Sequence, residues 1–108
     1  MKFSLSTNKA IRTLLLHYPN SYLLSEEEIE KTKTMSEERK IQFTAGRFAA
    51  KEAIIKCLSD IEVPRMSDLN ITNDEKGKPE ICYKDYDILL SISHEKNYAV
   101  AVALLQEE

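Results

Sequence analysis

The sequence predicts an α+β fold in which a small, mainly antiparallel sheet packs against one long central helix. Ser36 is a candidate helix N-cap, and the later half of the run from there to about Leu58 is apolar or small on nearly every side. After this helix, apolar residues recur at every second position, as in residues 69–71 and 90–92. A helix and strands of this kind bury their apolar faces against each other.

The first part of the chain supplies a strand and two further helices. Residues 2–5 alternate like a strand, and Asn8 is a candidate N-cap for a helix over residues 9–17. The Tyr-Pro-Asn sequence at 18–20 ends that helix. Ser-Glu-Glu-Glu at 25–28 fits a capping box and predicts a short polar helix.

The second part of the chain is predicted to form strands. A polar turn at residues 74–79 contains Gly77 and separates two alternating segments. A tight hairpin at residues 94–97 joins two more. The four strands are expected at residues 69–71, 81–83, 90–92 and 100–104.

Length and composition indicate one ordinary globular domain over residues 1–108, with 43% hydrophobic and 31% charged residues. The net charge of −3 argues against a general nucleic-acid binder. The sequence shows neither an apolar run long enough to cross a bilayer nor a signal-peptide pattern, so we expect a cytoplasmic protein without a membrane partner.

Glu52 is a carboxylate within the predicted central helix. At about 100° per residue it falls on the stripe that contains Ile41, Ala45, Phe48 and Ile55. A carboxylate on such a stripe needs a cation or several hydrogen-bond donors. One interpretation is a salt bridge to the lysine four residues on, and the other is a bound metal ion.

Three sequence motifs favour the metal. Residues 46–56 read Gly-Arg-Phe-Ala-Ala-Lys-Glu-Ala-Ile-Ile-Lys, residues 77–79 read Gly-Lys-Pro, and residues 91–101 read Ser-Ile-Ser-His-Glu-Lys-Asn-Tyr-Ala-Val-Ala. In this order and spacing they resemble the 4′-phosphopantetheinyl transferases, and in particular the short holo-acyl-carrier-protein synthase type. The resemblance runs from Ser25 to Leu105.

The resemblance implies transfer of the phosphopantetheine arm of coenzyme A to a serine of an acyl carrier protein, with magnesium as cofactor. Glu52 matches a metal ligand that also takes the serine proton, and Lys56 matches a residue that contacts the phosphates. These two are the implied catalytic residues. The implied coenzyme-binding residues are Arg47, Lys56, Lys78, Pro79, Ser93 and His94.

The amino terminus departs from the family pattern. The family strand reads Gly-Ile-Gly-x-Asp-Ile, and its aspartate is the second metal ligand. This chain has serine at positions 4 and 6 and Asn8 in place of the aspartate. An uncharged asparagine is expected to hold magnesium more weakly, and an Asn8→Asp exchange is expected to cost little stability because both residues are good N-caps.

The resemblance also implies partners. Short members assemble as homotrimers with the coenzyme site at each subunit interface. Acyl carrier proteins are acidic, and Lys9 and Arg12 lie three residues apart on one face of the first helix, which we expect to be the docking surface.

Three functional readings remain open. The first is an active transferase, and the second is a degenerate homologue that binds coenzyme A or carrier protein without efficient transfer. The third is a structural or interaction domain. Glu52, Lys56 and His94 together favour the first two, because a scaffold has no need of that trio.

Overall fold

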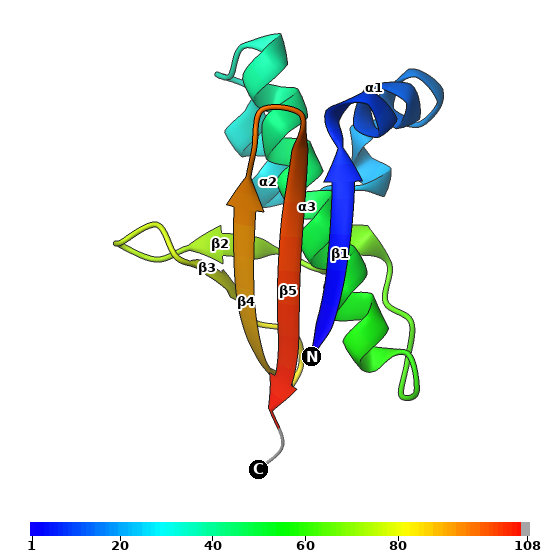
Figure 1. Cartoon of the computed structure of the whole chain (residues 1–108), viewed down its shortest axis with the longest axis vertical. Helices are drawn as coiled ribbons and strands as arrows, with labels where there is room; N and C mark the ends of the chain where they lie inside the picture. The colour runs from blue at the N-terminus through cyan, green and yellow to red at the C-terminus, as the bar shows by residue number, and fades with distance from the viewer. Residues whose placement is uncertain (107–108) are drawn as a thin grey trace.

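A computed structural model describes residues 1–106 and has the expected α+β architecture. Figure 1 shows the larger sheet in front of a long helix, with a hairpin projecting on the left and the first helix at the upper right. The elements follow in the order β1 (Lys2–Thr7), α1 (Asn8–His17), η1 (Asn20–Tyr22), α2 (Glu26–Thr32), α3 (Glu37–Leu58), η2 (Met66–Asp68), β2 (Ile71–Asn73), β3 (Pro79–Ile81), β4 (Asp87–His94) and β5 (Tyr98–Gln106).

The strands form two antiparallel sheets, where the sequence predicted one. The larger has the order β1-β5-β4, and the smaller is the β2-β3 hairpin. Its turn is closed by the Asp74 side chain, whose Oδ1 accepts from the backbone N–H groups of Lys76 and Lys78, both at 2.8 Å. Gly77 has a φ of +87°, a conformation that glycine adopts without a side-chain clash.

Small side chains let α3 lie close against the middle of the larger sheet. The central strand β5 turns Ala99, Ala101 and Ala103 inward, all fully buried. Opposite them α3 contributes Ala49 and Ala53, also fully buried. Because α3 fills this face, each of its sides lies beside a different edge of the sheet.

The helix boundaries agree with the capping residues read from the sequence at two of three helices. Ser25 caps α2 in a complete capping box with Glu28, and Ser36 caps α3. At α1 the prediction was wrong by one residue, because Thr7 is the N-cap and its side chain accepts from the Ala10 N–H at 3.1 Å. Asn8 is the first helical residue.

Glu28 is almost fully buried, with 1% of its surface exposed. Its Oε1 accepts from the Ser25 backbone N–H at 2.8 Å and from Lys51 Nζ. Its Oε2 accepts from the Ile71 backbone N–H at 3.2 Å. A single carboxylate therefore connects the start of α2, the middle of α3 and the start of β2.

Lys51 is the main cation that meets this carboxylate, and it is fully buried. Its Nζ also donates to the Leu23 carbonyl oxygen at 2.8 Å. Burial lowers the pKa of the Lys51 ammonium, and the Glu28 carboxylate opposes that shift. Buried charges of this kind are tolerated because they are paired and hydrogen-bonded.

The outer face of the larger sheet is apolar and exposed. Phe3 and Leu5 were predicted to share a face of the first strand, and both lie on this side, 59% and 58% exposed. The other strands of this sheet expose further apolar residues, namely Leu89 on β4 and Tyr98 and Leu104 on β5. Within residues 1–106, no helix has both the length and the apolar character that crossing a membrane requires.

We predict that Lys51→Met destabilises the protein by about 3–5 kcal/mol, because Glu28 loses its closest cation in a buried site. Urea denaturation at neutral pH measures the change in the free energy of unfolding. Lys33→Met is the matched control, since Lys33 pairs with Glu30 at 2.8 Å on an exposed surface and should contribute little. Equal losses in the two variants would contradict the role given to the buried pair.

Candidate functional site

Glu52 lies on the side of α3 that faces β1, and its side chain is half-buried. The Ser4 hydroxyl donates to Glu52 Oε1 at 3.1 Å. Among the described residues, none donates a hydrogen bond to Oε2. The carboxylate is thus held at one oxygen and free at the other, in a position less buried than its helical stripe predicted, because the stripe reaches the open edge of β1.

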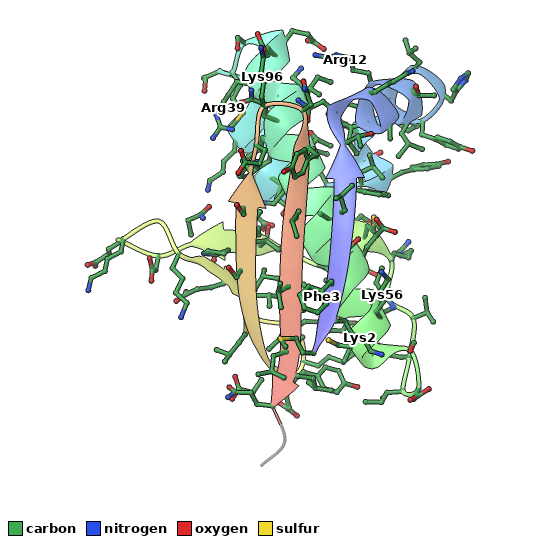
Figure 2. All side chains as sticks on the ribbon, viewed as in Figure 1. Lys2, Phe3, Arg12, Arg39, Lys56 and Lys96 are labelled. Carbon is green, nitrogen blue, oxygen red and sulfur yellow. The ribbon has the colours of Figure 1, made fainter. Side chains whose placement is uncertain are left out.

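Lys56 lies one helical turn beyond Glu52 and is exposed. Its Nζ donates to the Phe3 carbonyl oxygen at 2.8 Å, and Figure 2 shows the two residues at the same end of the molecule. The alternative of a Glu52–Lys56 salt bridge is not realised within residues 1–106, since each side chain contacts β1. An ammonium has three donors, so Lys56 keeps two for another acceptor.

Asn8 is tied to the hairpin between β4 and β5. Its Nδ2 donates to the Lys96 carbonyl oxygen at 3.1 Å, and its backbone N–H donates to the Asn97 carbonyl oxygen at 2.9 Å. The side chain is buried, with 7% exposure. A carbonyl partner requires the amide nitrogen on that side, which leaves Oδ1 as the free acceptor.

Two buried polar residues lie on the inner face of β1, and a third follows directly as the first residue of α1. Ser4, Ser6 and Asn8 are 7%, 4% and 7% exposed. The Ser6 hydroxyl has no hydrogen-bond partner among the described residues. With the free oxygen of Glu52, these side chains are hard oxygen donors of the kind that magnesium takes, so the donor set fits that cation, with one carboxylate rather than two.

A second group of residues lines a cavity of about 400 Å³ on another side of α3. Four basic side chains reach it, two from the predicted site and two that the sequence reasoning did not place there. The basic residues are Lys31, Arg39, Arg47 and His94. The wall opposite is the β2-β3 hairpin, with Asn73, Gly77 and Pro79. The cavity is suited to a phosphate or another anion.

Arg47 is held largely by the protein itself. Its guanidinium donates to Asn73 Oδ1 at 2.9 Å and to the Ile71 carbonyl oxygen at 3.3 Å, and lies 4.5 Å from the Phe43 ring centre. Its Nε is 3.4 Å from Glu28 Oε2. Burial lowers the pKa of Arg47, with Glu28 acting in the opposite direction. Arg47 therefore braces the β2-β3 hairpin against α3 at the base of the cavity.

His94 packs against Gly46 of α3. A Cβ at position 46 would lie 2.3 Å from His94 Cε1, so Gly46 is needed for this contact. Partial burial lowers the pKa of the His94 imidazole, and the positive charges of Arg39 and Arg47 add to the shift. The lowered pKa favours the neutral ring when no anion is bound.

Known proteins resemble this chain in sequence and in structure. A model of the 4′-phosphopantetheinyl transferase superfamily matches residues 11–103. A holo-[acyl-carrier-protein] synthase of Staphylococcus carnosus is 40% identical over 88 residues, which cover 79% of this chain and 75% of the relative. The chain belongs to the 4′-phosphopantetheinyl transferase superfamily. The resemblance read from its motifs is confirmed.

Other members of the superfamily are similarly close. A holo-[acyl-carrier-protein] synthase of Oceanobacillus iheyensis is 42% identical over 88 residues, 78% of this chain and 74% of the relative. A crystal structure of the holo-(acyl-carrier-protein) synthase of Bacillus anthracis in complex with coenzyme A (3′,5′-ADP) has a TM-score of 0.87 at 30% identity. The alignment covers 99% of this chain and 95% of that one.

The predicted coenzyme residues do not all lie together in this superfamily member. Arg47, Pro79 and His94 line the basic cavity, whereas Lys78 lines a separate hollow over β3 and β4. Ser93 is exposed and does not line the cavity, because neighbouring residues of a strand point to opposite faces. Glu52 and Lys56 lie at the β1 side.

The two groups lie on different sides of α3. Gly46, which receives His94, precedes Glu52 by six residues, about 9 Å along the helix axis and about 120° around it. Strand β5 also separates β1 from β4 in the sheet. Within one chain these residues therefore do not enclose a single cleft.

The predicted docking residues are on the surface of α1. Lys9 and Arg12 are exposed and line a hollow of about 360 Å³ together with Leu5 and Tyr98. Arg12 also borders a larger hollow of about 630 Å³ between α1 and the start of α3. The smaller hollow combines apolar side chains with two basic residues, whereas the larger one also has Glu37 and Glu38 on its rim.

Sequence reasoning missed three features of the site region, one of them the place of Arg39 at the cavity. Lys31 was read only as part of a polar helix, although the i+3 spacing from Glu28 and the turn of α2 bring it to the cavity. The Glu28–Lys51 pair was also missed. Lys51 lies among the small residues of the central helix, and a buried lysine is almost always paired with an acid. This was a signal for the missed pair.

We predict that His94 titrates below the ordinary value of about 6.5, as the neighbouring arginines and partial burial require. Adding adenosine 3′,5′-bisphosphate should raise the pKa, because a bound anion favours the imidazolium. Imidazole NMR signals in a His17→Gln background measure this with one histidine present. Titration at or above the ordinary value without ligand would contradict the described environment.

We also predict that Asn8→Asp destabilises the protein by about 1–3 kcal/mol at neutral pH, because a carboxylate cannot donate to the Lys96 carbonyl oxygen. This differs from the small cost expected when Asn8 was taken as an N-cap. Thermal and urea unfolding measure the loss. Asn97→Asp, in the same hairpin but exposed, is the control, and an equal effect of both variants would show that the Asn8–Lys96 contact contributes nothing.

Proposed function

We propose that this chain, as a single cytoplasmic domain, transfers the 4′-phosphopantetheine arm of coenzyme A to a serine of an acyl carrier protein. Membership of the superfamily and the holo-acyl-carrier-protein synthase names of its relatives support this reaction class. The observation that carries the proposal is the Glu52 carboxylate, with one oxygen held by Ser4 and the other free, one helical turn from Lys56.

In the proposed reaction the carrier serine oxygen bonds to the phosphorus nearer the pantetheine. The bond from that phosphorus to the bridging oxygen breaks, and adenosine 3′,5′-bisphosphate leaves. The Glu52 carboxylate takes the serine proton, a role that suits a partly exposed carboxylate. Lys56 Nζ, with two donors left, meets the phosphate on which negative charge increases.

Magnesium is the proposed cofactor, held by Glu52 with Asn8 Oδ1 as a neutral second ligand. Both atoms are hard oxygen donors, and both are free of hydrogen bonds within the described part of the chain. When bound, magnesium neutralises charge on the pyrophosphate. Because only one of the two ligands is charged, binding should depend on the phosphates of the coenzyme more than in a site with two carboxylates.

The basic cavity is the proposed site for the nucleotide half of coenzyme A. Arg39, Lys31 and His94 offer charge and hydrogen bonds, while Arg47 fixes the hairpin that carries Pro79. Lys78 and Ser93 are also proposed to contact the coenzyme. They would do so from outside this cavity, since neither lines it.

We propose a homotrimer in which each coenzyme lies between two subunits. Two observations support it. Glu52 and the basic cavity lie on different sides of one subunit, so a neighbour is needed to bring one of each together. The outer sheet face also exposes Phe3, Leu5 and Leu104, which a partner subunit would cover. Sedimentation that detects only monomer in the presence of coenzyme A would remove this part of the proposal.

The carrier protein is proposed to dock on α1 through Lys9 and Arg12. Both are exposed beside an apolar hollow, an arrangement that suits an acidic helix with a few apolar side chains. Figure 2 shows Arg12 on α1 at the upper end of the molecule, well apart from Lys56. The docking surface and the phosphate-contacting lysine are thus distinct.

A degenerate homologue that binds coenzyme A or carrier protein without efficient transfer is the second candidate. The state of Asn8 favours it, because the amide is uncharged and its nitrogen is engaged by Lys96. Mass spectrometry of an apo-carrier protein incubated with this protein, coenzyme A and magnesium separates the candidates. A gain of the phosphopantetheine mass supports the transferase, and binding of coenzyme A without that gain supports the alternative.

We predict that Glu52→Gln lowers the transfer rate by at least about 100-fold, because the variant loses both the base and the charged metal ligand. The rate of holo-carrier formation under a magnesium titration measures it. Glu38→Gln, an exposed change on the same helix, is the control. Full activity of Glu52→Gln would show that the reaction does not use this carboxylate.

We further predict that Lys9→Glu combined with Arg12→Glu reduces kcat/KM for the carrier protein by about 10-fold or more at low salt, through slower association. The difference should shrink as salt rises, because salt screens exposed charges. Lys33→Glu combined with Lys76→Glu makes the same change in net charge elsewhere, with coenzyme A kept saturating. If both pairs have equal effects, docking does not use α1.

A further inference from the structure

The inner face of β1 is unusual for a strand packed on a helix. The corresponding face of β5 carries only alanines at Ala99, Ala101 and Ala103, and that of β4 carries Ile88 and Leu90, all buried. On β1 the two buried positions are Ser4 and Ser6, and Asn8, the first residue of α1, is buried directly after them. Apolar residues would fill the same space, so these hydroxyl and amide groups call for partners.

Two of the three have partners. The Ser4 hydroxyl donates to Glu52 Oε1, and the Asn8 amide donates to the Lys96 carbonyl oxygen. Ser6, between them, is 4% exposed, and its hydroxyl has no partner in the described part of the chain. Leaving a buried hydroxyl without a hydrogen bond is unfavourable, and an alanine at this position would avoid the cost.

The position of Ser6 indicates what its partner is. Side chains two residues apart on a strand point to the same face, about 6.7 Å apart along it. Ser6 is therefore one strand repeat from Ser4, which contacts Glu52, and it precedes Asn8, the first residue of α1, by two residues in the chain. Along the chain, the unpartnered hydroxyl thus lies between the residue that holds Glu52 and Asn8, the proposed second metal ligand.

Resting on the function proposed above, we propose that Ser6 is a positioning residue of the cation site: its Oγ hydrogen-bonds a water molecule bound to the divalent cation at Glu52. Magnesium usually keeps several waters when it binds protein carboxylates, and groups that hold such waters affect affinity. Ser6 donates one proton or offers two lone pairs, so it can serve either orientation of the water. A neutral hydroxyl thus contributes where this chain lacks a second carboxylate.

The test uses Mn²⁺, a paramagnetic ion with the same preference for oxygen ligands. Binding of Mn²⁺ to the full chain is measured by electron paramagnetic resonance, with and without coenzyme A. Ser6→Ala should weaken Mn²⁺ binding about 10-fold, at the lower end of the effects seen for such outer partners. Ser91→Ala, an exposed serine of β4, is the control and should bind Mn²⁺ like the wild type.

A second readout excludes a merely structural role. In EDTA the melting temperature of Ser6→Ala should equal or exceed that of the wild type, because the variant removes an unpartnered buried hydroxyl. Weaker Mn²⁺ binding with undiminished stability supports the proposal. Mn²⁺ affinity within about twofold of the wild type overturns it. If Ser6→Ala does not fold, Ser6→Cys keeps the side-chain volume with a poor hydrogen-bonding group and carries the same expectation.

The measurement also separates this inference from the proposed function. A wild type that binds neither coenzyme A nor Mn²⁺ contradicts both. A wild type that binds both ligands, with Ser6→Ala equal to it, contradicts the role of Ser6 alone. Coenzyme A binding should respond to the loss of Ser6 only when the cation is present, so a loss of coenzyme affinity in EDTA would also count against the proposal.

Discussion

The Glu28 carboxylate is the point at which distant segments of this fold are joined. It accepts hydrogen bonds from the Ser25 and Ile71 backbone N–H groups and from the Lys51 ammonium. Lys51 extends the connection to the Leu23 carbonyl, and Arg47 extends it to the hairpin at Asn73. Such a pair adds little net stability compared with apolar packing, but removing one partner is costly. It therefore acts chiefly to specify one arrangement of α2, α3 and β2.

That arrangement determines where the functional side chains lie. With Lys51 and Arg47 turned towards α2 and the hairpin, the next positions around α3 place Glu52 beside β1. The alanine contact between α3 and β5 lets helix and sheet approach closely, and Gly46 lets His94 rest on the helix. The residues proposed for metal and for nucleotide are thus on separate sides of one rigid helix. The homotrimer proposed above would bring one residue group of each kind together.

The segment from β1 to Asn8 has both a structural role and a proposed role in cation binding. Asn8 joins the start of α1 to the β4-β5 hairpin through a donor that an aspartate lacks, so its amide has a structural use independent of any metal. Asparagine in place of the family's aspartate also leaves the proposed cation site with one negative charge fewer. Ser4 and Ser6 bring neutral oxygens to the same face, one of them already holding Glu52. The chemistry of this strand is better described as a polar surface built around one carboxylate than as a damaged two-carboxylate site.

The sequence by itself determined those features that depend on near neighbours or on short motifs. The sequence was sufficient to predict the caps at Ser25 and Ser36, the turn at Gly77, the change from helical to alternating apolar spacing after α3, and the family. Each of these arises within a few residues or within a short motif. The capping residue of α1 was misassigned by one position, since Thr7 and Asn8 are both good caps and only the backbone path distinguishes them.

Tertiary structure alone decided the pairings across long stretches of chain. Glu28 with Lys51 and Asn8 with Lys96 join residues 23 and 88 positions apart, and no local pattern specifies such partners. The same holds for the unpartnered hydroxyl of Ser6 and for the separation of Glu52 from His94. Burial converts each of these polar groups from an optional hydrogen-bonding group into one that must be paired, and burial is a property of the packed chain.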